Sequence, residues 1–470
     1  MSSSTLRILS WRSIQNAINN FYKVPDYING PTNAHANLRL FPDPENSITL
    51  DKKPPRVILY RDNHAWCPYC QKIWLFLEEK RIPYEIKKVT MFCYGQKEAW
   101  YKQIVPRGML PALSIDGNVI TESDVILAEL EKEFGVLGGG GSLLTDKSVL
   151  VNRKLERKLF SAWCSWLCRE SNWIESEISA KNNFQSACKV LEARILETGN
   201  GYFMNSEFGI SDCILAPYVE RMQASLYYYK GFNMREEHPV IDRWFSAMEE
   251  RSTYRGTKSD FHTHVHDLPP QMGGCYFDKF SINQDQSIRE MVNSAVNKVD
   301  CPKQYQGTEI VPDREIDESK FTEPKDCRLE AIHRVLKHKD NMSKINPVKG
   351  EPFDLVLRAV CSDMLAENLK LNPENGFKLD DSESDLVETL PRGAGLASRY
   401  IRDRLSVPRD MSFWAGRRFR QALDKVAGVK KEEGGFCCEE DLAEYESDAS
   451  GVWGIPFEHR RDSNPVPFRK

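Results

Sequence analysis

The strongest chemical signal in this sequence is the motif Cys67-Pro68-Tyr69-Cys70. Two cysteines three positions apart at the start of a helix share one turn, and the unpaired N–H groups of that turn stabilise a thiolate at Cys67. Pro68 suits the first helical position because its missing N–H would have had no partner there. Cys70 lies one turn later, where it can attack a mixed disulfide on Cys67 or pack into the core. The motif therefore predicts a redox-active nucleophile at Cys67.

Zinc is the main alternative for a Cys-x-x-Cys motif, which supplies half of a four-ligand site. Neither His64 nor Cys93 provides a second close-spaced pair of ligands, so the sequence favours redox chemistry and predicts no metal. A second candidate metal site is the run from His262 to His266, where three imidazoles alternate along the chain. We expect a polar loop there rather than a metal site, because other ligands are scarce nearby.

Two more short segments have the chemistry to bind an extended peptide with a charged end. Pro111 begins a predicted strand, where proline is expected only at the strand start or in a cis peptide bond. A cis bond would expose the backbone N–H and C=O of Leu110 beside the sheet edge. Glu122 and Ser123 begin a predicted helix, where Ser123 could hold a carboxylate and Glu122 could accept from an ammonium group. The γ-glutamyl end of glutathione carries both groups on one carbon, whereas an isolated Glu-Ser pair would only cap the helix.

Hydrophobic patterns place these residues between the short elements of one small domain. Residues 57–60 form an apolar run rich in β-formers, and Ile73, Trp74 and Leu77 share one face of a helix over 71–80. The other predicted elements are a strand at 84–89, a helix at 97–104, a hairpin with strands at 112–115 and 119–120, and a helix at 122–134. The order β-α-β-α-β-β-α begins with a βαβ unit, whose parallel strands are joined by a right-handed crossover.

Changes in composition divide the 470 residues into regions, and at ~150 residues per domain the length suits about three domains. Gly138 to Ser142 predicts a flexible linker, and apolar stripes predict helices from 143 to about 250. The fold class is α+β, with a thioredoxin-like domain, an all-helical domain and a mostly helical extension. Its predicted helices lie at 285–297, 327–338, 352–370 and 394–427. The predicted regions are an N-terminal extension at 1–54, the thioredoxin-like domain at 55–136, the all-helical domain at 143–272, the extension at 273–428 and a charged, disordered tail at 429–470.

Residues 57–134 and the helical region after them resemble a glutathione transferase of the cysteine type, the group that includes the omega class. The resemblance rests on six residues that follow the family's pattern: Cys67, Lys97, Leu110, Pro111, Glu122 and Ser123. It implies that Cys67 is the catalytic nucleophile, with Cys70 as a second catalytic thiol or a packed one, and that the other five residues bind glutathione. It also implies that Lys97 binds the glycine carboxylate of glutathione. Without the resemblance, we would expect Lys97 to be a solvated surface lysine.

Three longer segments are similar to the iota class of glutathione transferases, which occurs in photosynthetic organisms. They are Tyr60–Cys70, Val89–Gly95 and Asp403–Met411, and the similarity runs from about Pro31 to Ala427. Members of that class carry a long C-terminal extension of unassigned role. The sequence departs from the pattern at Tyr69, where many relatives have tryptophan, and at Gly209, where transferases usually have a Ser or Thr helix cap. Glycine at an N-cap costs only about a few tenths of a kcal/mol, so we expect the second domain to fold.

Composition excludes several other classes of protein. The chain has 64 Lys plus Arg against 68 Asp plus Glu, a balance that argues against a nucleic-acid-binding protein. No apolar run reaches the ~18 residues of a membrane span. Thirteen scattered cysteines fit a reducing compartment better than a secreted disulfide framework, and we expect Cys164 and Cys168 to be small core residues. The first 24 residues are rich in serine and contain no acid, which fits an organelle transit peptide or a loosely docked start. We therefore expect a soluble protein of the cytoplasm or the chloroplast stroma.

Together these features predict a glutathione-dependent thiol transferase or deglutathionylating reductase, with dehydroascorbate as one candidate substrate. Its partners would be glutathione as co-substrate and small or protein-bound disulfides, and the protein could form a homodimer. The alternative is a non-catalytic binding or scaffold protein that acts on a protein partner through the extension at 273–428. The basic stretch from Arg392 to Arg420 could dock an anionic partner, although a solvated helix face is the default expectation. A scaffold need not keep Cys67, Lys97, Glu122 and Ser123 together, so their retention favours the enzyme.

Overall fold

The computed structural model describes most of the chain and resolves it into two compact units. The described residues are 6–23, 55–139, 141–197, 201–280, 282–296, 299–300, 324–371, 384–387, 390–391 and 393–428. Unit 1 takes its described residues from Met1–Val24, Asn293–Val296 and Thr322–Pro465, and unit 2 takes them from Pro25–Val292 and Asn297–Phe321. Most of the predicted extension at 1–54 and the whole predicted tail at 429–470 lie outside the described residues. Within the part that is described, no helix has the length and apolar character needed to cross a bilayer.

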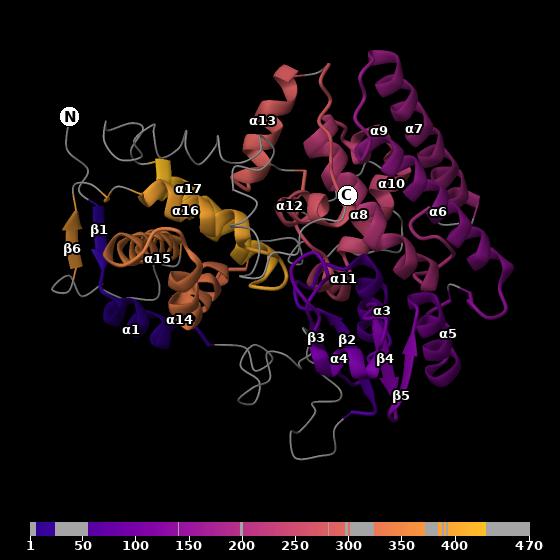
Figure 1. Ribbon diagram of the computed structural model, residues 1–470, viewed down its shortest axis with the longest axis horizontal. Coiled ribbons are helices and arrows are strands. Elements are labelled where there is room, and N and C mark those ends of the chain that lie inside the picture. Colours follow the sequence, from indigo (N-terminus) through magenta and orange to yellow (C-terminus); the bar gives the residue numbers. More distant parts are fainter. Residues whose placement is uncertain are drawn as a thin grey trace. The chain divides into compact units, whose positions relative to one another are not determined.

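Unit 2 contains the predicted thioredoxin-like domain, built on a four-stranded sheet. Strands β2 (Val57–Asp62), β3 (Tyr84–Val89), β4 (Ala112–Ile115) and β5 (Asn118–Thr121) lie in the order β3-β2-β4-β5. β2 is parallel to β3, whereas β4 is antiparallel to both β2 and β5. Helices α3 (Pro68–Glu79), α4 (Ala99–Ile104) and α5 (Ser123–Phe134) complete the predicted order (Figure 1). Because Ala112 is opposite both Tyr60 and Thr121, the end of β2, the start of β4 and the end of β5 meet at one end of the sheet.

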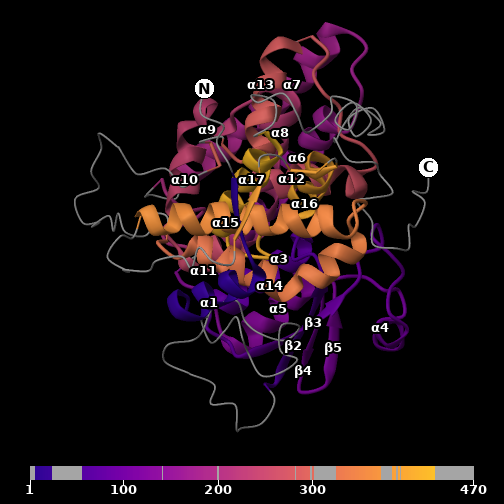
Figure 2. The same cartoon turned by 90° about the vertical axis from the view of Figure 1, so that its left-hand side faces the viewer.

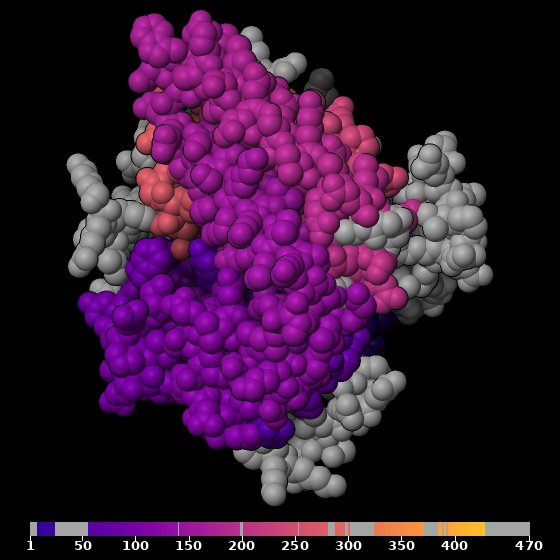
Figure 3. Space-filling model, turned by 90° about the vertical axis from the view of Figure 1, so that its right-hand side faces the viewer, coloured from indigo at the N-terminus to yellow at the C-terminus, as the bar shows by residue number. Residues whose placement is uncertain are grey.

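The all-helical part of unit 2 is built around α8 (Ile210–Lys230), whose residues are all buried. This helix packs against α3, α6 (Lys147–Leu167) and α12 (Phe261–Met272). The other helices of this part are α7 (Ile174–Glu197), α9 (Met234–Glu237), α10 (Pro239–Glu249) and α11 (Ser252–Thr257), and α13 (Ile282–Asn293) follows α12. Figure 3 shows the face of unit 2 on which α5, α6 and α7 lie. The contact between α3 and α8 means that the helical part directly supports the helix that begins at the cysteine motif.

The unusual glycine cap of α8 is supported by a buried carboxylate. Gly209 has no side chain to offer, but the Asp212 carboxylate accepts hydrogen bonds from the backbone N–H groups of Gly209 and Met204, each at 3.0 Å. Trp244 Nε1 donates to the same carboxylate at 2.8 Å. Burial raises the pKa of Asp212 to about 6 despite these bonds. The Asp212 side chain, three residues into the sequence after Gly209, therefore holds the start of α8 in place of a capping side chain. The glycine does not prevent the helix from forming.

The prediction of a polar loop at His262–His266 is wrong. These residues lie in α12, and all three histidine side chains are buried. Asp260 caps the helix by accepting a hydrogen bond from Thr263 N at 3.0 Å. Phe261, Val265 and Leu268 are spaced by one helical turn and are also buried, which supplies the apolar face that a helix needs. The alternation of histidines concealed this spacing.

Unit 1 has its own hydrophobic core, formed by segments that are far apart in the sequence. A two-stranded antiparallel sheet joins β1 (Leu6–Leu9) to β6 (Ser384–Val387). The helices are α1 (Trp11–Phe21), α14 (Cys327–Ile345), α15 (Glu351–Leu371), α16 (Ala394–Arg404) and α17 (Phe413–Gly428) (Figure 2). Buried side chains from all five helices and from β1 meet in one cluster, including Ile8, Ile14, Ile332, Val360, Ala397 and Leu423.

The changes in composition separate residues 1–54 from residues 273–428, whereas the structure joins Leu6–Phe21 to the core of the extension. Leu9 N donates a hydrogen bond to Ser362 Oγ at 2.9 Å, and Trp11 Nε1 donates to Asp354 Oδ1 at 2.6 Å. The strand and helix are short, and their partners lie more than 300 positions away, so local periodicity gave little sign of them. A targeting role for the first residues stays a prediction.

The predicted helical segment at 394–427 is two helices rather than one. α16 ends at Arg404 and α17 begins at Phe413. The break contains the Val407–Pro408 peptide, which is cis. Proline has no N–H to donate within a helix, and it disfavours the helical conformation of the residue before it, so a break at this point is expected.

Candidate active site

Cys67 and Cys70 occupy different environments at the start of α3. Cys67 is the N-cap residue, with φ −55° and ψ 121°, and its carbonyl accepts from Gln71 N at 3.0 Å. Cys70 lies inside the first turn, where its side chain hydrogen-bonds to that of Cys67, and both thiols are free. Burial raises the pKa of Cys70 well above the usual thiol value, and the neighbouring Cys67 raises it further. Cys70 therefore holds its proton, whereas Cys67 stands at the N-terminal end of the helix, where the helix dipole is positive.

Asp62 lies beside both thiols, and the sequence analysis missed it. This residue ends β2 and is fully buried. One carboxylate oxygen accepts from Trp66 N at 2.7 Å, and the other has no hydrogen-bond partner among the residues that the structure describes. A carboxylate oxygen and the two sulfur atoms lie within 4.8 Å of one another. The three groups can exchange a proton, and they could also share a thiophilic cation with one ligand fewer than a structural zinc site uses.

Lys97 is brought to the same place by the loop that precedes α4. Its Nζ donates to the carbonyl of Thr90 at 2.7 Å, and its aliphatic stem crosses Gly108, where an added Cβ would lie 2.9 Å from Lys97 Cδ. Gly108 also has φ +64°, so two separate reasons favour glycine at this position. Burial lowers the pKa of Lys97, and attraction to the sulfur atoms of Cys70 and Cys67 partly offsets this effect. Lys97 is therefore a partly buried cation next to the thiol pair rather than a solvated surface lysine.

The remaining predicted residues lie at the same end of the sheet. The Leu110–Pro111 peptide is cis, and Pro111 stands immediately before β4. Glu122 is the N-cap of α5 with φ 67°, a left-handed conformation that costs a non-glycine residue about 1–2 kcal/mol. Ser123 is the first residue of α5 and is buried. The Glu122 side chain makes no capping hydrogen bond, so the first N–H groups of α5 are left as donors at this end of the sheet.

A closed ring of buried contacts links the cysteine motif to the helical part of unit 2. Arg221 of α8 donates to the carbonyl of Trp66, the residue before Cys67, and to Gln71 Oε1 at 2.9 Å. Its guanidinium also lies over the Trp66 ring, with 4.5 Å from Cζ to the ring centroid. Glu220 accepts from Gln71 Nε2 at 3.0 Å. These contacts join positions about 150 residues apart in the chain and hold both sides of the motif.

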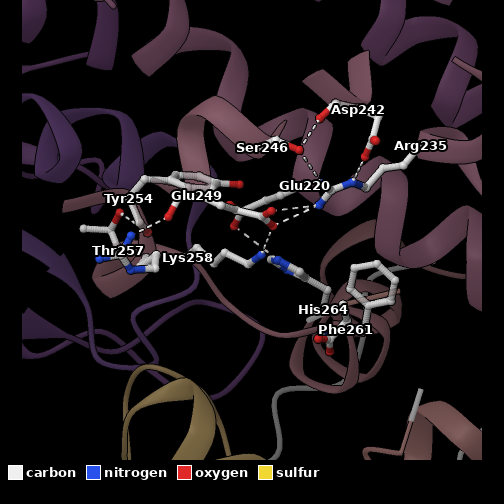
Figure 4. Close-up of polar contacts among 12 residues, drawn as sticks. Glu220, Arg235, Asp242, Ser246, Glu249, Tyr254, Thr257, Lys258, Phe261 and His264 are labelled. Carbon is white, nitrogen blue, oxygen red and sulfur yellow. Dashed lines mark hydrogen bonds and ion pairs between the residues drawn. The ribbon is translucent and has the colours of Figure 1, made fainter. Parts of the chain in front are cut away.

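His264 of α12 closes this ring. Trp66 Nε1 donates to His264 Nδ1 at 3.1 Å. His264 Nε2 lies 3.1 Å from Glu220 Oε1 (Figure 4). Burial lowers the pKa of His264, which favours a neutral ring that accepts at Nδ1 and donates at Nε2. Burial also lowers the pKa of Arg221, while the charges of Glu220 and Cys67 act in the opposite direction. A buried cation thus lies within electrostatic reach of the Cys67 sulfur.

A second buried ion cluster lies beside this ring and fixes the helices around it. The Glu249 carboxylate is 3.0 Å from Arg235 Nη1 and 2.7 Å from Lys258 Nζ (Figure 4). Arg235 also donates to Asp242 and Ser246 of α10. Burial alone would raise the pKa of Glu249, but Arg235 and Lys258 lower it below its usual value. The cluster therefore contains an ionised, paired carboxylate that ties α9, α10 and the segment before α12 together.

Two family models match segments in the two parts of unit 2. The family model of the glutathione S-transferase N-terminal domain matches residues 66–133, and that of the glutathione S-transferase C-terminal domain matches residues 169–247. The first match contains the cysteine motif, Lys97, Pro111 and Ser123. The second contains all of α7, α8 and α9, and most of α10.

Individual relatives match less than half of the chain. The glutathione S-transferase DHAR3, chloroplastic, of Arabidopsis thaliana is 25% identical over 212 residues, which cover 44% of this chain and 75% of the relative. The probable glutathione S-transferase DHAR1, cytosolic, of Oryza sativa subsp. japonica is 28% identical over 195 residues, which cover 41% of this chain and 84% of the relative. Among solved structures, glutathione transferase Omega 3C from Trametes versicolor aligns at 24% identity and a TM-score of 0.39, covering 46% of this chain and 95% of its own.

Proposed function

We propose that this chain, which contains the N- and C-terminal domains of the glutathione S-transferase family, is a glutathione-dependent thiol transferase with Cys67 as its nucleophile. The observation that carries the proposal is the asymmetry of the two thiols. Cys70 is kept protonated by burial, whereas Cys67 occupies the N-cap position of α3 with the Lys97 and Arg221 cations nearby. The helix N-terminus and these cations would stabilise the negative charge that a cysteine sulfur carries during thiol exchange.

The reaction has two exchange steps. The Cys67 thiolate attacks the glutathione sulfur of a glutathionylated substrate, so that a Cys67–glutathione disulfide forms and the substrate leaves as a thiolate that takes up a proton. A second glutathione thiolate then attacks the glutathione sulfur of this mixed disulfide, which yields glutathione disulfide and restores the Cys67 thiolate. With dehydroascorbate as substrate, two glutathione molecules supply the two electrons and are released as the same disulfide.

The binding pose follows from the arrangement at the end of the sheet. The exposed backbone of Leu110, before the cis Pro111, would pair with the backbone of glutathione. Ser123 and the N–H groups at the start of α5 would hold the γ-glutamyl carboxylate, and Glu122 would accept from its ammonium group. Lys97 would bind the glycine carboxylate at the other end. This pose places the glutathione sulfur at Cys67, the residue between these two anchors.

The wider expectations about the protein are also proposals. Small disulfides and glutathionylated proteins fit the chemistry of Cys67. The names of the relatives include one chloroplastic and one cytosolic protein, and we propose one of these two compartments for this chain. A homodimer and the similarity to the iota class also stay predictions.

The test compares matched cysteine variants of the full chain. Cys67→Ser should remove thiol transferase activity and the glutathione adduct seen by intact mass after incubation with glutathione disulfide. Cys70→Ser should keep much of both, because release by a second glutathione needs only Cys67. Cys93→Ser is the control, since Cys93 is buried and lies outside the motif. Full activity in Cys67→Ser would refute the proposal, and equal loss in Cys67→Ser and Cys70→Ser would replace the one-thiol cycle by a dithiol cycle.

The scaffold alternative predicts a different outcome. If the full chain is inactive on every glutathione disulfide tried while unit 1 binds a partner on its own, the extension rather than Cys67 carries the function. Glutathione binding without turnover would point the same way, because a scaffold can retain a ligand site without a reactive thiolate.

A further inference from the structure

Three cysteines form a cluster of free thiols far along the chain from the Cys67 motif. Cys164 and Cys168 lie at the end of α6, and Cys275 lies in the segment that follows α12. The side chain of Cys164 hydrogen-bonds to that of Cys168, which also hydrogen-bonds to that of Cys275. The first two are partly exposed rather than part of the core that the sequence analysis expected, and Cys275 is buried.

The backbone holds Cys168 and Cys275 next to each other. Tyr276 N donates to the carbonyl of Leu167 at 2.9 Å, so the residues that adjoin the two cysteines are bonded to one another. Two residues later, Asp278 N donates to the carbonyl of Tyr229 at 2.9 Å, which fixes the same segment against α8. The close approach of Cys168 and Cys275 is therefore set by backbone hydrogen bonds and does not depend on side-chain rotation alone.

Of the two neighbouring pairs, Cys168 with Cys275 is the better suited to a disulfide. Cys164 and Cys168 are one turn apart on the same helix, where the Cα–Cβ bonds point in nearly the same direction, and bridging them would distort the last turn of α6. Cys275 approaches Cys168 from a different segment. The Lys230 side chain, which is paired with Glu177 at 2.9 Å, also acts electrostatically on Cys168 and favours its thiolate.

We propose that Cys168 and Cys275 form a second redox site, which closes to a disulfide when small disulfides accumulate and then locks the segment after α12 to the end of α6. The reaction is two exchanges with a small disulfide such as glutathione disulfide. The Cys168 thiolate displaces one glutathione thiolate and becomes a mixed disulfide. The Cys275 thiolate then attacks the Cys168 sulfur and displaces the second glutathione. The protein loses two thiol protons, and one disulfide becomes two thiols.

This site is slower than Cys67 and is independent of it. Hydrogen bonding to Cys275 and burial raise the pKa of Cys168 to about 12, although the bond from Cys164 acts in the opposite direction, so little thiolate is present at neutral pH. Closure should therefore follow the glutathione adduct on Cys67 rather than precede it. The bridge closes a loop of about a hundred residues, and it should raise the midpoint of thermal unfolding by about 5–10 °C.

The experiment uses the full chain with Cys67→Ser, so that it does not depend on the proposed enzymatic activity. After incubation with glutathione disulfide at pH 8, peptide mapping without reduction should give one linked pair that contains Cys168 and Cys275. The thermal midpoint should rise and should return to its starting value with dithiothreitol. In the double variant with Cys275→Ser, Cys168 should keep a glutathione adduct and the rise should vanish. Cys188→Ser is the control, because Cys188 is buried on α7 and should leave the linkage unchanged.

Two results would overturn the inference. One is a stable glutathione adduct on Cys168 while Cys275 is present, which would show that the second thiol does not resolve the first. The other is a bridge between Cys164 and Cys168, which would show that the helix end distorts more readily than the backbone contacts imply. If the full chain showed no thiol transferase activity and no glutathione adduct on Cys67 but still formed the Cys168–Cys275 disulfide, only the proposed function would be refuted.

Discussion

Replacing Arg221 by lysine tests whether the buried ring positions the cysteine motif. Lysine keeps the positive charge beside Glu220 but loses the planar fork that reaches both the Trp66 carbonyl and Gln71 Oε1. The matched control is Arg235→Lys. Arg235 is also deeply buried in the same unit and paired with a buried glutamate, but its partners Asp242 and Glu249 lie on α10, away from the motif.

The magnitude follows from the bonds that each variant loses. A hydrogen bond from a charged group contributes about 1.5–3 kcal/mol, so Arg221→Lys and Arg235→Lys should each lower the free energy of unfolding by about 2–4 kcal/mol. The reactivity of Cys67 should respond differently. Without the fork, the Trp66 carbonyl and Gln71 can move, and the cation can shift away from the sulfur. We expect the alkylation rate of Cys67 at pH 7 to fall by about tenfold in Arg221→Lys only.

Urea unfolding and the rate of iodoacetamide modification, followed by mass at the Cys67 peptide, separate the two effects. A positioning role requires equal losses of stability but unequal losses of reactivity. If Arg221→Lys were destabilised yet reacted at the wild-type rate, the ring would be a structural feature only. If Arg235→Lys lost reactivity to the same extent, general loosening of unit 2 would explain both variants.

The other substitutions test the ligand site and the buried charges. Ser123→Ala and Glu122→Gln should each weaken glutathione binding by about 1–3 kcal/mol in calorimetry, and unchanged affinity in both would mean that the proposed pose is wrong. Because burial lowers the pKa of Lys97, binding of S-methylglutathione should weaken at alkaline pH as Lys97 loses its proton, whereas Lys97→Arg should bind up to a higher pH. A common pH profile for the two proteins would exclude Lys97 as the anchor. Glu249→Gln should lose about 3–5 kcal/mol at pH 7 because it leaves two buried cations uncompensated. The pKa of Glu249 is lower in the folded state, so its contribution is present at neutral pH and disappears as pH falls through that lowered value, and the two stability curves should then converge.

Local signals explain why the thioredoxin-like domain and the Cys67 motif could be predicted from the sequence. Each strand and helix there has its own periodicity, and a strand followed by a cysteine motif with proline at the first helical position locates the proposed nucleophile. The cis bond before Pro111 and the helix start at Ser123 also follow from single residues in their local context. Those features depend on neighbours a few positions away.

The rest of the site depends on contacts that no local pattern records. In the sequence, Asp62 belongs to a polar run that follows the apolar residues 57–60, which is typical of a loop. Only the fold shows that its carboxylate is buried beside the two sulfur atoms. Arg221 and His264 reach the motif across about 150 and 200 positions, so their roles require the packing of α8 against α3 and of α12 against α8. A charged residue in a helix most often faces solvent, so the burial of Arg221 could not be predicted from the sequence. The alternating histidines at 262–266 suggested an extended segment, so α12 was not predicted either.

The division into units changes where the chain should be cut to test the extension. A fragment that ends at Gly273 would keep β1 and α1, whose buried Ile8, Ile14 and Ile18 pack in the core of unit 1, and it would lose the segment that bonds to α6 and α8. We therefore expect a 1–273 fragment to aggregate, because apolar side chains become exposed and Leu167 and Tyr229 lose backbone partners.

A 55–280 fragment keeps both domains of unit 2 and the Tyr276 and Asp278 bonds. It should fold in one cooperative transition and retain thiol transfer with small disulfides at a rate within about threefold of the full chain. The measurement is turnover together with sedimentation and thermal unfolding of both fragments. A soluble, folded 55–280 fragment that binds glutathione but does not turn over would show that unit 1 completes the active site, and a stable 1–273 fragment would show that residues 6–21 do not need the core of unit 1.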